Sequence, residues 1–297
     1  MARLVLIAPD KFKGTLTAPD AARAIATGWH QARPHDDLIL QPISDGGDGF
    51  GALMAETLHG EIISCDAANA AGKPTTAAYW LTPDHTAIIE SASVIGLAML
   101  EPSQRAPFEN NSTGLGQIIL HATANGAKRL IVGIGGSATN DGGFGMARAL
   151  GWEFLDSANK PITQWAALRQ LRSIKQPLNF SLPPVTVAVD VQNPLLGPEG
   201  CTRVYGPQKG FNETDISPAE DALKTLARTW ENQMGEAADR LPGAGAAGGL
   251  GFGLYCFLKA NLQSGFALFA RTVRLAEKLT EADIVITGEG GMDRQTV

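Results

Sequence analysis

Short runs of aliphatic and β-branched residues alternate along the chain with longer segments whose hydrophobic residues recur at helical spacing. The run RLVLIA at residues 3–8 predicts a buried strand. Residues 19–31 predict a helix, because this segment has an acidic residue in its first turn and apolar residues at helical spacing. The same criteria predict strands at 38–43, 61–65, 75–81, 86–90, 129–134, 185–189 and 282–287. They also predict a helix ending at Leu58, helices at 115–125, 143–150 and 217–234, and one running from the small-residue stretch 242–253 to residue 262.

This repetition of strand, loop and helix predicts an α/β fold of two α/β domains with largely parallel sheets covered on both faces. The runs 61–65 and 75–81 flank the turn sequence AGKP at 71–74, so we expect them to form an antiparallel pair. An insertion or a second domain is therefore predicted to begin near this block.

Composition narrows the class of protein. The 297 residues are about twice a typical domain length. With 24 Lys and Arg against 30 Asp and Glu, the net charge is −6. This balance argues against a nucleic-acid partner, which needs a clustered basic face, and against extensive contact with an anionic membrane. No apolar run approaches the ~20 residues of a membrane helix, and the run 4–8 is too short for a signal peptide.

The three cysteines and five histidines are scattered, without the spacing of a zinc site. Sparse cysteines are typical of a reducing compartment, so a cytoplasmic location is predicted.

Five predicted loops follow strands, at the edge of a parallel sheet where ligands bind. They span residues 8–15, 45–49, 133–143, 190–194 and 288–293. Each carries carboxylates, glycines or hydroxyls, and none carries histidine. Glycines let the backbone approach phosphate, and Mg²⁺ takes carboxylate and phosphate oxygens, so the set favours phosphoryl transfer over acyl or hydride transfer. Turns and helix caps would be the better explanation of a single loop of this kind, and it is the set of five loops at strand ends that favours phosphoryl transfer.

Several features have two interpretations. Asp141 is either a helix N-cap or a metal ligand. Lys13 and Lys209 lie in glycine-flanked loops, where each is either a solvated surface lysine or a phosphate ligand. The patterns Gly133-x-Gly135-x-x-Ala138 and 243–248 (GAGAAG) resemble dinucleotide-binding turns, which makes NAD binding a weaker alternative. No GxxxxGK[ST] sequence is present, which excludes a P-loop ATPase.

Seven segments carry a more specific signal. They are APDKFKGTL at 8–16, SDGGDG at 44–49, IGGSATNDGG at 134–143, DVQNPLLG at 190–197, GPQKG at 206–210, LPGAGAAGGLG at 241–251 and TGEGGMD at 287–293. In this order they resemble the motifs of the bacterial glycerate kinase type I family (glycerate 2-kinases) over essentially the whole chain. The resemblance implies a kinase that uses ATP and Mg²⁺ to phosphorylate a hydroxyl of D-glycerate, giving 2-phosphoglycerate. It leaves the oligomeric state open.

The resemblance also implies a domain arrangement. Residues 1–62 and 283–297 would form a discontinuous, Rossmann-like N-terminal domain, and residues 63–282 an inserted α/β domain, with the active site in the cleft between them. Family members continue beyond the GEG loop, whereas this chain ends at Val297, so we expect the first domain to be incomplete at its C-terminus. Gly291 stands where the family usually has arginine. These two departures favour an alternative, in which the protein binds nucleotide or metabolite without catalysis.

The matching positions give the expected site residues. The expected catalytic residues are Asp190, Asp45 and Lys13. The residues expected to bind substrate or phosphate are Asp10, Gly14, Gly46, Gly47, Ser137, Thr139, Asn140, Asn193, Gln208 and Lys209. The expected metal ligands are Asp293, Glu289 and Asp141. By charge, Lys13 or Lys209 would neutralise the glycerate carboxylate or the transferred phosphate, and Asp190 or Asp45 would contact the reacting hydroxyl.

Overall fold

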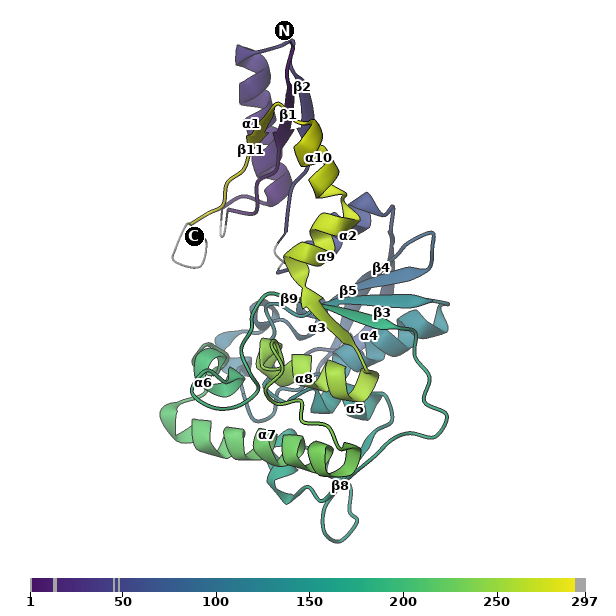
Figure 1. The fold of residues 1–297 in the computed structure, drawn as a ribbon. Coiled ribbons are helices and arrows are strands. Elements are labelled where there is room, and N and C mark those ends of the chain that lie inside the picture. The colour runs from purple at the N-terminus through teal and green to yellow at the C-terminus, as the bar shows by residue number, and fades with distance from the viewer. Residues whose placement is uncertain (1, 13–14, 45, 48, 292–297) are drawn as a thin grey trace.

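The computed structural model describes residues 2–12, 15–44, 46–47 and 49–291. Within these ranges the strands form a three-stranded sheet, a six-stranded sheet and a two-stranded ribbon, which confirms a mixed α/β fold with mostly parallel sheets (Figure 1). The strands are β1 (Leu4–Ile7), β2 (Asp37–Leu40), β3 (Glu61–Ala68), β4 (Pro74–Leu81), β5 (Thr86–Glu90), β6 (Arg129–Gly133), β7 (Glu153–Leu155), β8 (Ser173–Lys175), β9 (Val185–Val189), β10 (Asn261–Ser264) and β11 (Ile284–Ile286). The α-helices are α1 (Ala18–Ala32), α2 (Phe50–Thr57), α3 (Ala92–Ile95), α4 (Thr113–Ala124), α5 (Phe144–Ala149), α6 (Cys201–Tyr205), α7 (Glu213–Met234), α8 (Ala246–Leu258), α9 (Gly265–Thr272) and α10 (Leu275–Glu281). Short 3₁₀ turns are η1 (Leu97–Met99), η2 (Pro102–Gln104), η3 (Trp165–Gln170) and η4 (Pro207–Lys209).

The three-stranded sheet has the order β11-β1-β2, and both of its pairings are parallel. Val5 and Ile7 of β1 are fully buried and cluster with Ala22 of α1. Leu6 faces the other way and belongs to a different cluster, which includes Leu275 of α10. Since successive strand residues point to opposite faces, the hydrophobic run predicted at 3–8 is explained by helices on both sides.

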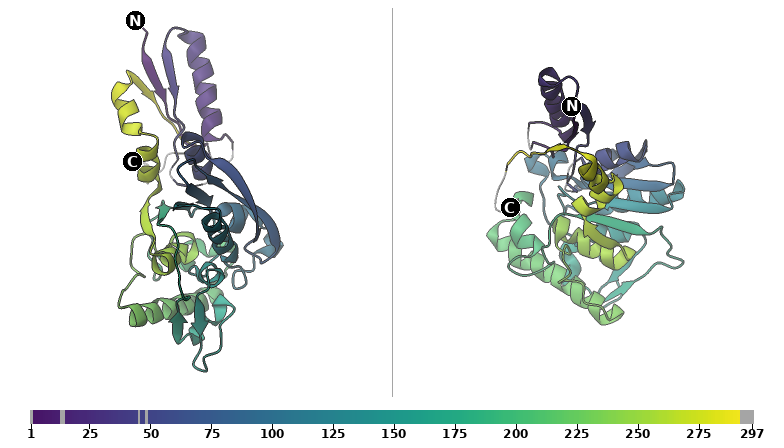
Figure 2. Two further views of the ribbon diagram at one scale, coloured as in Figure 1. Left: turned by 90° about the vertical axis from the view of Figure 1, so that its right-hand side faces the viewer. Right: turned by 45° about the horizontal axis from the view of Figure 1, so that its top comes forward.

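The six-stranded sheet has the order β10-β9-β6-β5-β4-β3, with β10, β9, β6 and β5 parallel and β4 and β3 antiparallel. The predicted antiparallel pair is confirmed, because β3 and β4 pair over their whole length. Helices α4, α5 and α8 cover one face, and α2 and α9 cover the other (Figures 1 and 2). Neighbouring residues of strand β5 pack on the two faces of the sheet. Ile89 belongs to the cluster that includes α4, α5 and α8, and Ile88 belongs to the cluster that includes Phe50 of α2.

The prediction of a helix running to residue 262 is wrong. Helix α8 ends at Leu258, where Lys259 adopts a left-handed conformation (φ 54°), and β10 then pairs with β9 at the edge of the sheet. Left-handed residues commonly terminate helices, although glycine is more usual there. The sequence NLQS of β10 has no β-branched residue and therefore carries no local strand signal. Helices α9 and α10 follow and were not predicted.

One hydrophobic cluster joins the two main sheets. It contains Leu6 of β1, Phe50 of α2, Ile88 of β5 and Phe269 of α9. In Figure 1 the strands of the three-stranded sheet run from the far end of the molecule toward the six-stranded sheet, so their carboxyl ends face it. The predicted domain boundaries, after residues 62 and 282, stay a prediction.

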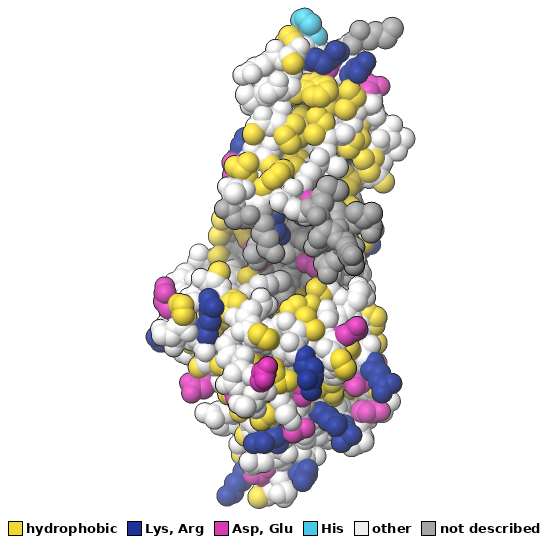
Figure 3. All heavy atoms as spheres, turned by 90° about the vertical axis from the view of Figure 1, so that its left-hand side faces the viewer, with side chains coloured by type: hydrophobic (Ala, Val, Ile, Leu, Met, Phe, Trp, Pro, Cys, Tyr) yellow, Lys and Arg dark blue, Asp and Glu magenta, His cyan; other side chains and the backbone are white. Residues whose placement is uncertain are grey.

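The surface view in Figure 3 shows positive and negative side chains interspersed over the part that carries the six-stranded sheet. Hydrophobic side chains gather toward the opposite end in this view. Val285 of the edge strand β11 is 44% exposed. Among the described residues, no helix has the combination of length and apolar character needed to cross a bilayer.

Candidate functional site

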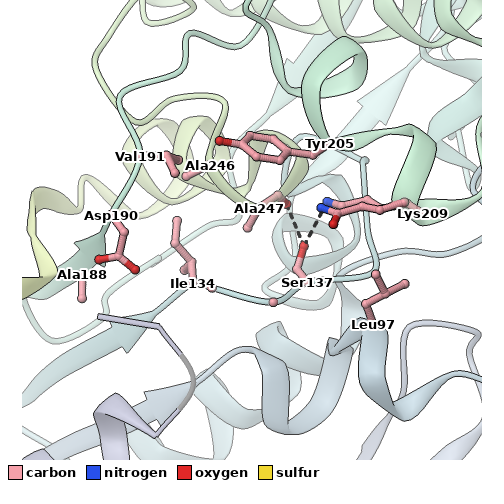
Figure 4. A pocket seen from close by; sticks show the side chains of 13 residues that line it. Leu97, Ile134, Ser137, Ala188, Asp190, Val191, Tyr205, Lys209, Ala246 and Ala247 are labelled. Carbon is pink, nitrogen blue, oxygen red and sulfur yellow. Dashed lines mark hydrogen bonds between the residues drawn. The ribbon is translucent and has the colours of Figure 1, made fainter. Parts of the chain in front are cut away.

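A cavity of about 190 Å³ lies beyond the carboxyl ends of β6 and β9, where the parallel-sheet rule places ligands (Figure 4). Its polar lining comes from three of the loops singled out in the sequence. The lining residues are Leu97, Ile134, Gly135, Gly136, Ser137, Ala188, Asp190, Val191, Tyr205, Gln208, Lys209, Ala246 and Ala247. Four of these, Ser137, Asp190, Gln208 and Lys209, were predicted as site residues. Three others, Leu97, Ala188 and Tyr205, lie outside the seven segments: Ala188 is in the predicted strand 185–189, Tyr205 directly precedes the GPQKG segment, and Leu97 has no sequence signal of its own.

The glycine-rich loop after β6 forms one wall of this cavity. Its backbone is fixed by the segment after α3, because the N–H of Leu97 donates to the carbonyl of Gly136 (2.8 Å) and the N–H of Ala138 donates to that of Ile95 (2.8 Å). The hydroxyl of Ser137 donates to the carbonyl of Ala247 (3.0 Å). Hydrogen bonds to two other segments of the chain therefore hold this wall.

Lys209 enters the cavity from the turn 206–210 and is only 2% exposed. Its Nζ donates to the carbonyl of Thr139 (2.6 Å) and lies 3.4 Å from the Ser137 hydroxyl (Figure 4). Desolvation lowers the pKa of Lys209 to about 8, against the opposing influence of Cys201 and Asp141. The amine is thus a buried cation at neutral pH, beside a loop that permits close approach of an anion.

Asp190, the first residue after β9, lies on the other side of the cavity from Lys209, with Ile134 between them (Figure 4). Its carboxylate contacts the loop that follows β2. A Cβ atom built on Gly46 would lie 2.4 Å from Oδ1 of Asp190, and one built on Gly135 would lie 3.3 Å from Cα of Gly47. The structure therefore brings together Gly46, Gly47 and Asp190, which lie in separate segments of the sequence.

Other predicted residues stand behind the cavity wall. Thr139 and Asn140 are buried and do not line the cavity, and the amide of Asn140 donates to the hydroxyl of Thr202 (2.9 Å). Asn193 accepts a hydrogen bond from the Tyr205 hydroxyl (2.7 Å) and so holds that ring. Direct contact of Thr139, Asn140 and Asn193 with a ligand stays a prediction.

The loop after β1 lines a second cavity of about 610 Å³, which includes Asp10 and Gly49. The N–H of Asp10 donates to the carbonyl of Gly288 (2.8 Å), so the loops after β1 and β11 lie side by side, and Glu289 is exposed next to them. A third cavity of about 530 Å³ shares Gly49 with this one and Gly136 with the Lys209 cavity. Three adjoining cavities therefore connect the loop after β1 with the loops after β6 and β9.

Four predicted site residues lie outside the described residues: Lys13, Gly14, Asp45 and Asp293.

Asp141 is fully buried at the start of α5, away from the cavity lining. Its carboxylate accepts from the N–H groups of Ser112 (2.9 Å), Gly143 (3.1 Å) and Gly145 (2.9 Å) and from the Ser112 hydroxyl (2.8 Å). Burial raises the pKa of Asp141, although these hydrogen bonds act to lower it. The N-cap residue of α5 is Gly143, so Asp141 is not itself the N-cap, although its carboxylate accepts from N–H groups at the start of this helix. The metal-ligand role stays a prediction.

We expect Asp141→Asn to lower the free energy of unfolding by about 3 kcal/mol, because an amide NH₂ would face buried N–H donors and leave them unpaired. Urea denaturation of the protein with and without Mg²⁺ measures this. A variant as stable as the wild type, with an altered Mg²⁺ dependence, would instead indicate a metal ligand.

The pattern GAGAAG at 243–248 serves close backbone packing. A Cβ atom on Gly245 would lie 2.1 Å from the carbonyl oxygen of Pro194, and one on Gly248 would lie 1.9 Å from that of Thr139. These contacts place the start of α8 against the two ligand-facing loops and account for the glycines without a dinucleotide.

Comparisons with known proteins identify the family of this chain. The family model described as the glycerate kinase family matches residues 5–297. A glycerate kinase of Halalkalibacterium halodurans is 40% identical over 99% of this chain and 78% of its own length, and a glycerate 2-kinase of Escherichia coli is 36% identical over the same shares. The crystal structure of glycerate kinase 2 from Salmonella typhimurium superposes with a TM-score of 0.89 at 38% identity, covering 100% of this chain and 81% of that one.

These matches extend over nearly the whole described fold and confirm the resemblance drawn from the seven segments. They also confirm an enzyme of the kinase class. The chain belongs to the glycerate kinase family.

Proposed function

We propose that this protein transfers the γ-phosphate of ATP to the 2-hydroxyl of D-glycerate and so forms 2-phosphoglycerate. The observation that carries the proposal is the placement of Asp190 and Lys209 on opposite sides of one cavity at the carboxyl ends of β6 and β9. The names of the relatives, glycerate kinase and glycerate 2-kinase, support the acceptor and the position of transfer.

In this proposal Asp190 accepts a hydrogen bond from the reacting hydroxyl, orients it toward the phosphate and takes its proton during transfer. Asp190 is an exposed residue at the end of a strand, next to the backbone of Gly46. Lys209 neutralises charge on the transferred phosphoryl group, and its burial strengthens that interaction, because little water screens it. Gly135 and Gly136 leave space for phosphate oxygens to approach the backbone.

The oxygen ligands along the cavities fit a Mg²⁺ ion that arrives with ATP. Mg²⁺ takes one or two carboxylates together with phosphate oxygens, and Glu289 is an exposed carboxylate beside the loop that carries Asp10. Within the described ranges no three His, Cys, Asp or Glu side chains form a metal cluster, so the residues present suit a shared ion rather than a protein cage. When bound, Mg²⁺ would supply charge neutralisation on the phosphates.

The predicted cleft between the two domains would also shield the reaction from water. The cavities lined by Asp10 and by Lys209 lie on the two sides of the predicted division between residues 1–62 with 283–297 and residues 63–282. Closure of these two parts on each other would exclude water from the transferred phosphate.

The test is to incubate the protein with ATP, Mg²⁺ and D-glycerate and to identify the product by ³¹P NMR. The proposal predicts 2-phosphoglycerate. Formation of 3-phosphoglycerate would overturn the assigned hydroxyl. Calorimetric binding of both substrates without any phosphoglycerate would overturn catalysis and support a non-catalytic binding protein, and a change in nicotinamide fluorescence on titration would support the NAD alternative.

A further inference from the structure

The cavity of about 530 Å³ that joins the other two contains an arginine that the sequence analysis did not single out. Arg105 lines it together with Glu90 and Ser93. The cavity shares Leu97 and Gly136 with the one that holds Asp190 and Lys209, so a ligand in one is next to a ligand in the other. Among the described residues that line these three cavities, Arg105 is the only arginine.

The backbone of Arg105 is held in place at the end of η2. Its N–H donates to the carbonyl of Pro102 (3.2 Å), and Glu101 and Gln104 form a capping box around the same turn. Gly210 packs against this turn in a left-handed conformation (φ 103°), and a Cβ atom there would lie only 2.9 Å from the carbonyl oxygen of Arg105. The turn that carries Lys209 is thus in backbone contact with Arg105, and the positions of the two cations are coupled.

The guanidinium of Arg105 is exposed and makes no hydrogen bond or ion pair within the part of the chain that the structure describes. Arg203, by contrast, pairs with Glu220 (3.0 Å). In the same cavity, Oε1 of Glu90 accepts from the N–H of Gly51 (2.7 Å), at the N-terminus of α2, where a negative charge is stabilised. A guanidinium offers two parallel N–H donors that match a carboxylate.

We propose that Arg105 binds the carboxylate of the acceptor and restricts the enzyme to small hydroxy acids, excluding neutral polyols. This inference rests on the proposed function. The carboxylate and the 2-hydroxyl of such an acid are on adjacent carbon atoms, so a hydroxyl at Asp190 requires a cation in a neighbouring space. Lys209 faces the transferred phosphate. Arg105 lies across the wall formed by Leu97 and Gly136, and it is the only other Lys or Arg among the described residues that line these two cavities.

The experiment compares the wild type with Arg105→Gln, Arg105→Lys and the control Arg169→Gln, an exposed arginine in η3 that lines none of these cavities. Arg105→Gln should raise KM for D-glycerate by about 10- to 100-fold, the range of a charge-assisted hydrogen bond, with little change in kcat or in KM for ATP. Arg105→Lys should lie between, because lysine keeps the charge without the paired donors. Arg169→Gln should match the wild type.

Glyceramide separates charge recognition from a structural effect. The KM for glyceramide should be the same in the wild type and in Arg105→Gln, because glyceramide has an amide in place of the carboxylate that the guanidinium would bind. An equal loss on the acid and on the amide overturns the inference, as does a higher KM for ATP with unchanged KM for D-glycerate, which would place Arg105 on the nucleotide phosphates.

Calorimetric titration with D-glycerate keeps the test independent of turnover. If the wild type forms no phosphoglycerate, the proposed function fails, but weaker D-glycerate binding by Arg105→Gln still supports a carboxylate site. Equal affinity in the two proteins overturns the inference, whatever the result for catalysis.

Discussion

Replacing Asp190 by asparagine is expected to lower kcat for D-glycerate phosphorylation by about 10²- to 10⁴-fold, the usual contribution of a positioned general base. The amide preserves the shape of the side chain and its contact with the backbone of Gly46, but it does not accept the hydroxyl proton. Since Asp190 is exposed, the free energy of unfolding should stay within about 0.5 kcal/mol of the wild type. Steady-state kinetics and urea denaturation measure the two quantities.

A matched control is Asp221→Asn, on the exposed side of α7, which should leave both quantities unchanged. If Asp190→Asn retained kcat within about tenfold of the wild type, Asp190 would not be the base, and Asp45 would become the stronger candidate.

Replacing Lys209 by methionine is expected to lower kcat/KM by about 10²- to 10³-fold, because the transferred phosphoryl group would lose a buried cation. The control Lys224→Met removes an exposed lysine from α7 and should have no effect. Unchanged kinetics in the Lys209 variant would exclude a phosphate contact.

The pH profile makes the role of Lys209 testable in the unmodified enzyme. Its amine is charged below a pKa of about 8, so kcat/KM should fall by about tenfold per pH unit above that value. Stability should change in the opposite direction. Between pH 8 and 10.5 the Lys209 amine is protonated in the unfolded chain but not in the folded chain. The free energy of unfolding therefore rises with pH over this range, because the cost of burying the charged amine disappears. Lys209→Met should lack both dependences.

Much of the fold is predictable because local patterns and tertiary packing agree. Strand β9 was predicted with its observed bounds, Val185–Val189, since a parallel strand covered on both faces has a nearly continuous run of apolar and β-branched residues. Strand β10 was not predicted, because its pairing with β9, rather than its own sequence, makes it a strand. Helix α10 is short and begins after the left-handed residue Arg274, without any of the usual capping signals.

The site was predictable to a similar degree. The rule that ligands bind at the carboxyl ends of parallel strands placed Ser137 and Asp190 together before the sheet order was known. It did not reveal the burial of Lys209, because a lysine between glycines has the same sequence whether it is solvated or enclosed by Thr139 and Ser137. Arg105 was missed for a related reason, because its contact with Gly210 joins segments far apart in the chain.

The most direct measurement is a crystal structure of the protein soaked with D-glycerate and a non-hydrolysable ATP analogue with Mg²⁺. We expect the acceptor hydroxyl within hydrogen-bond distance of Asp190, the γ-phosphate beside Lys209, and both ligands in the adjoining cavities between the strand ends. Finding either ligand bound elsewhere, with those two side chains in contact only with solvent, would contradict this expectation.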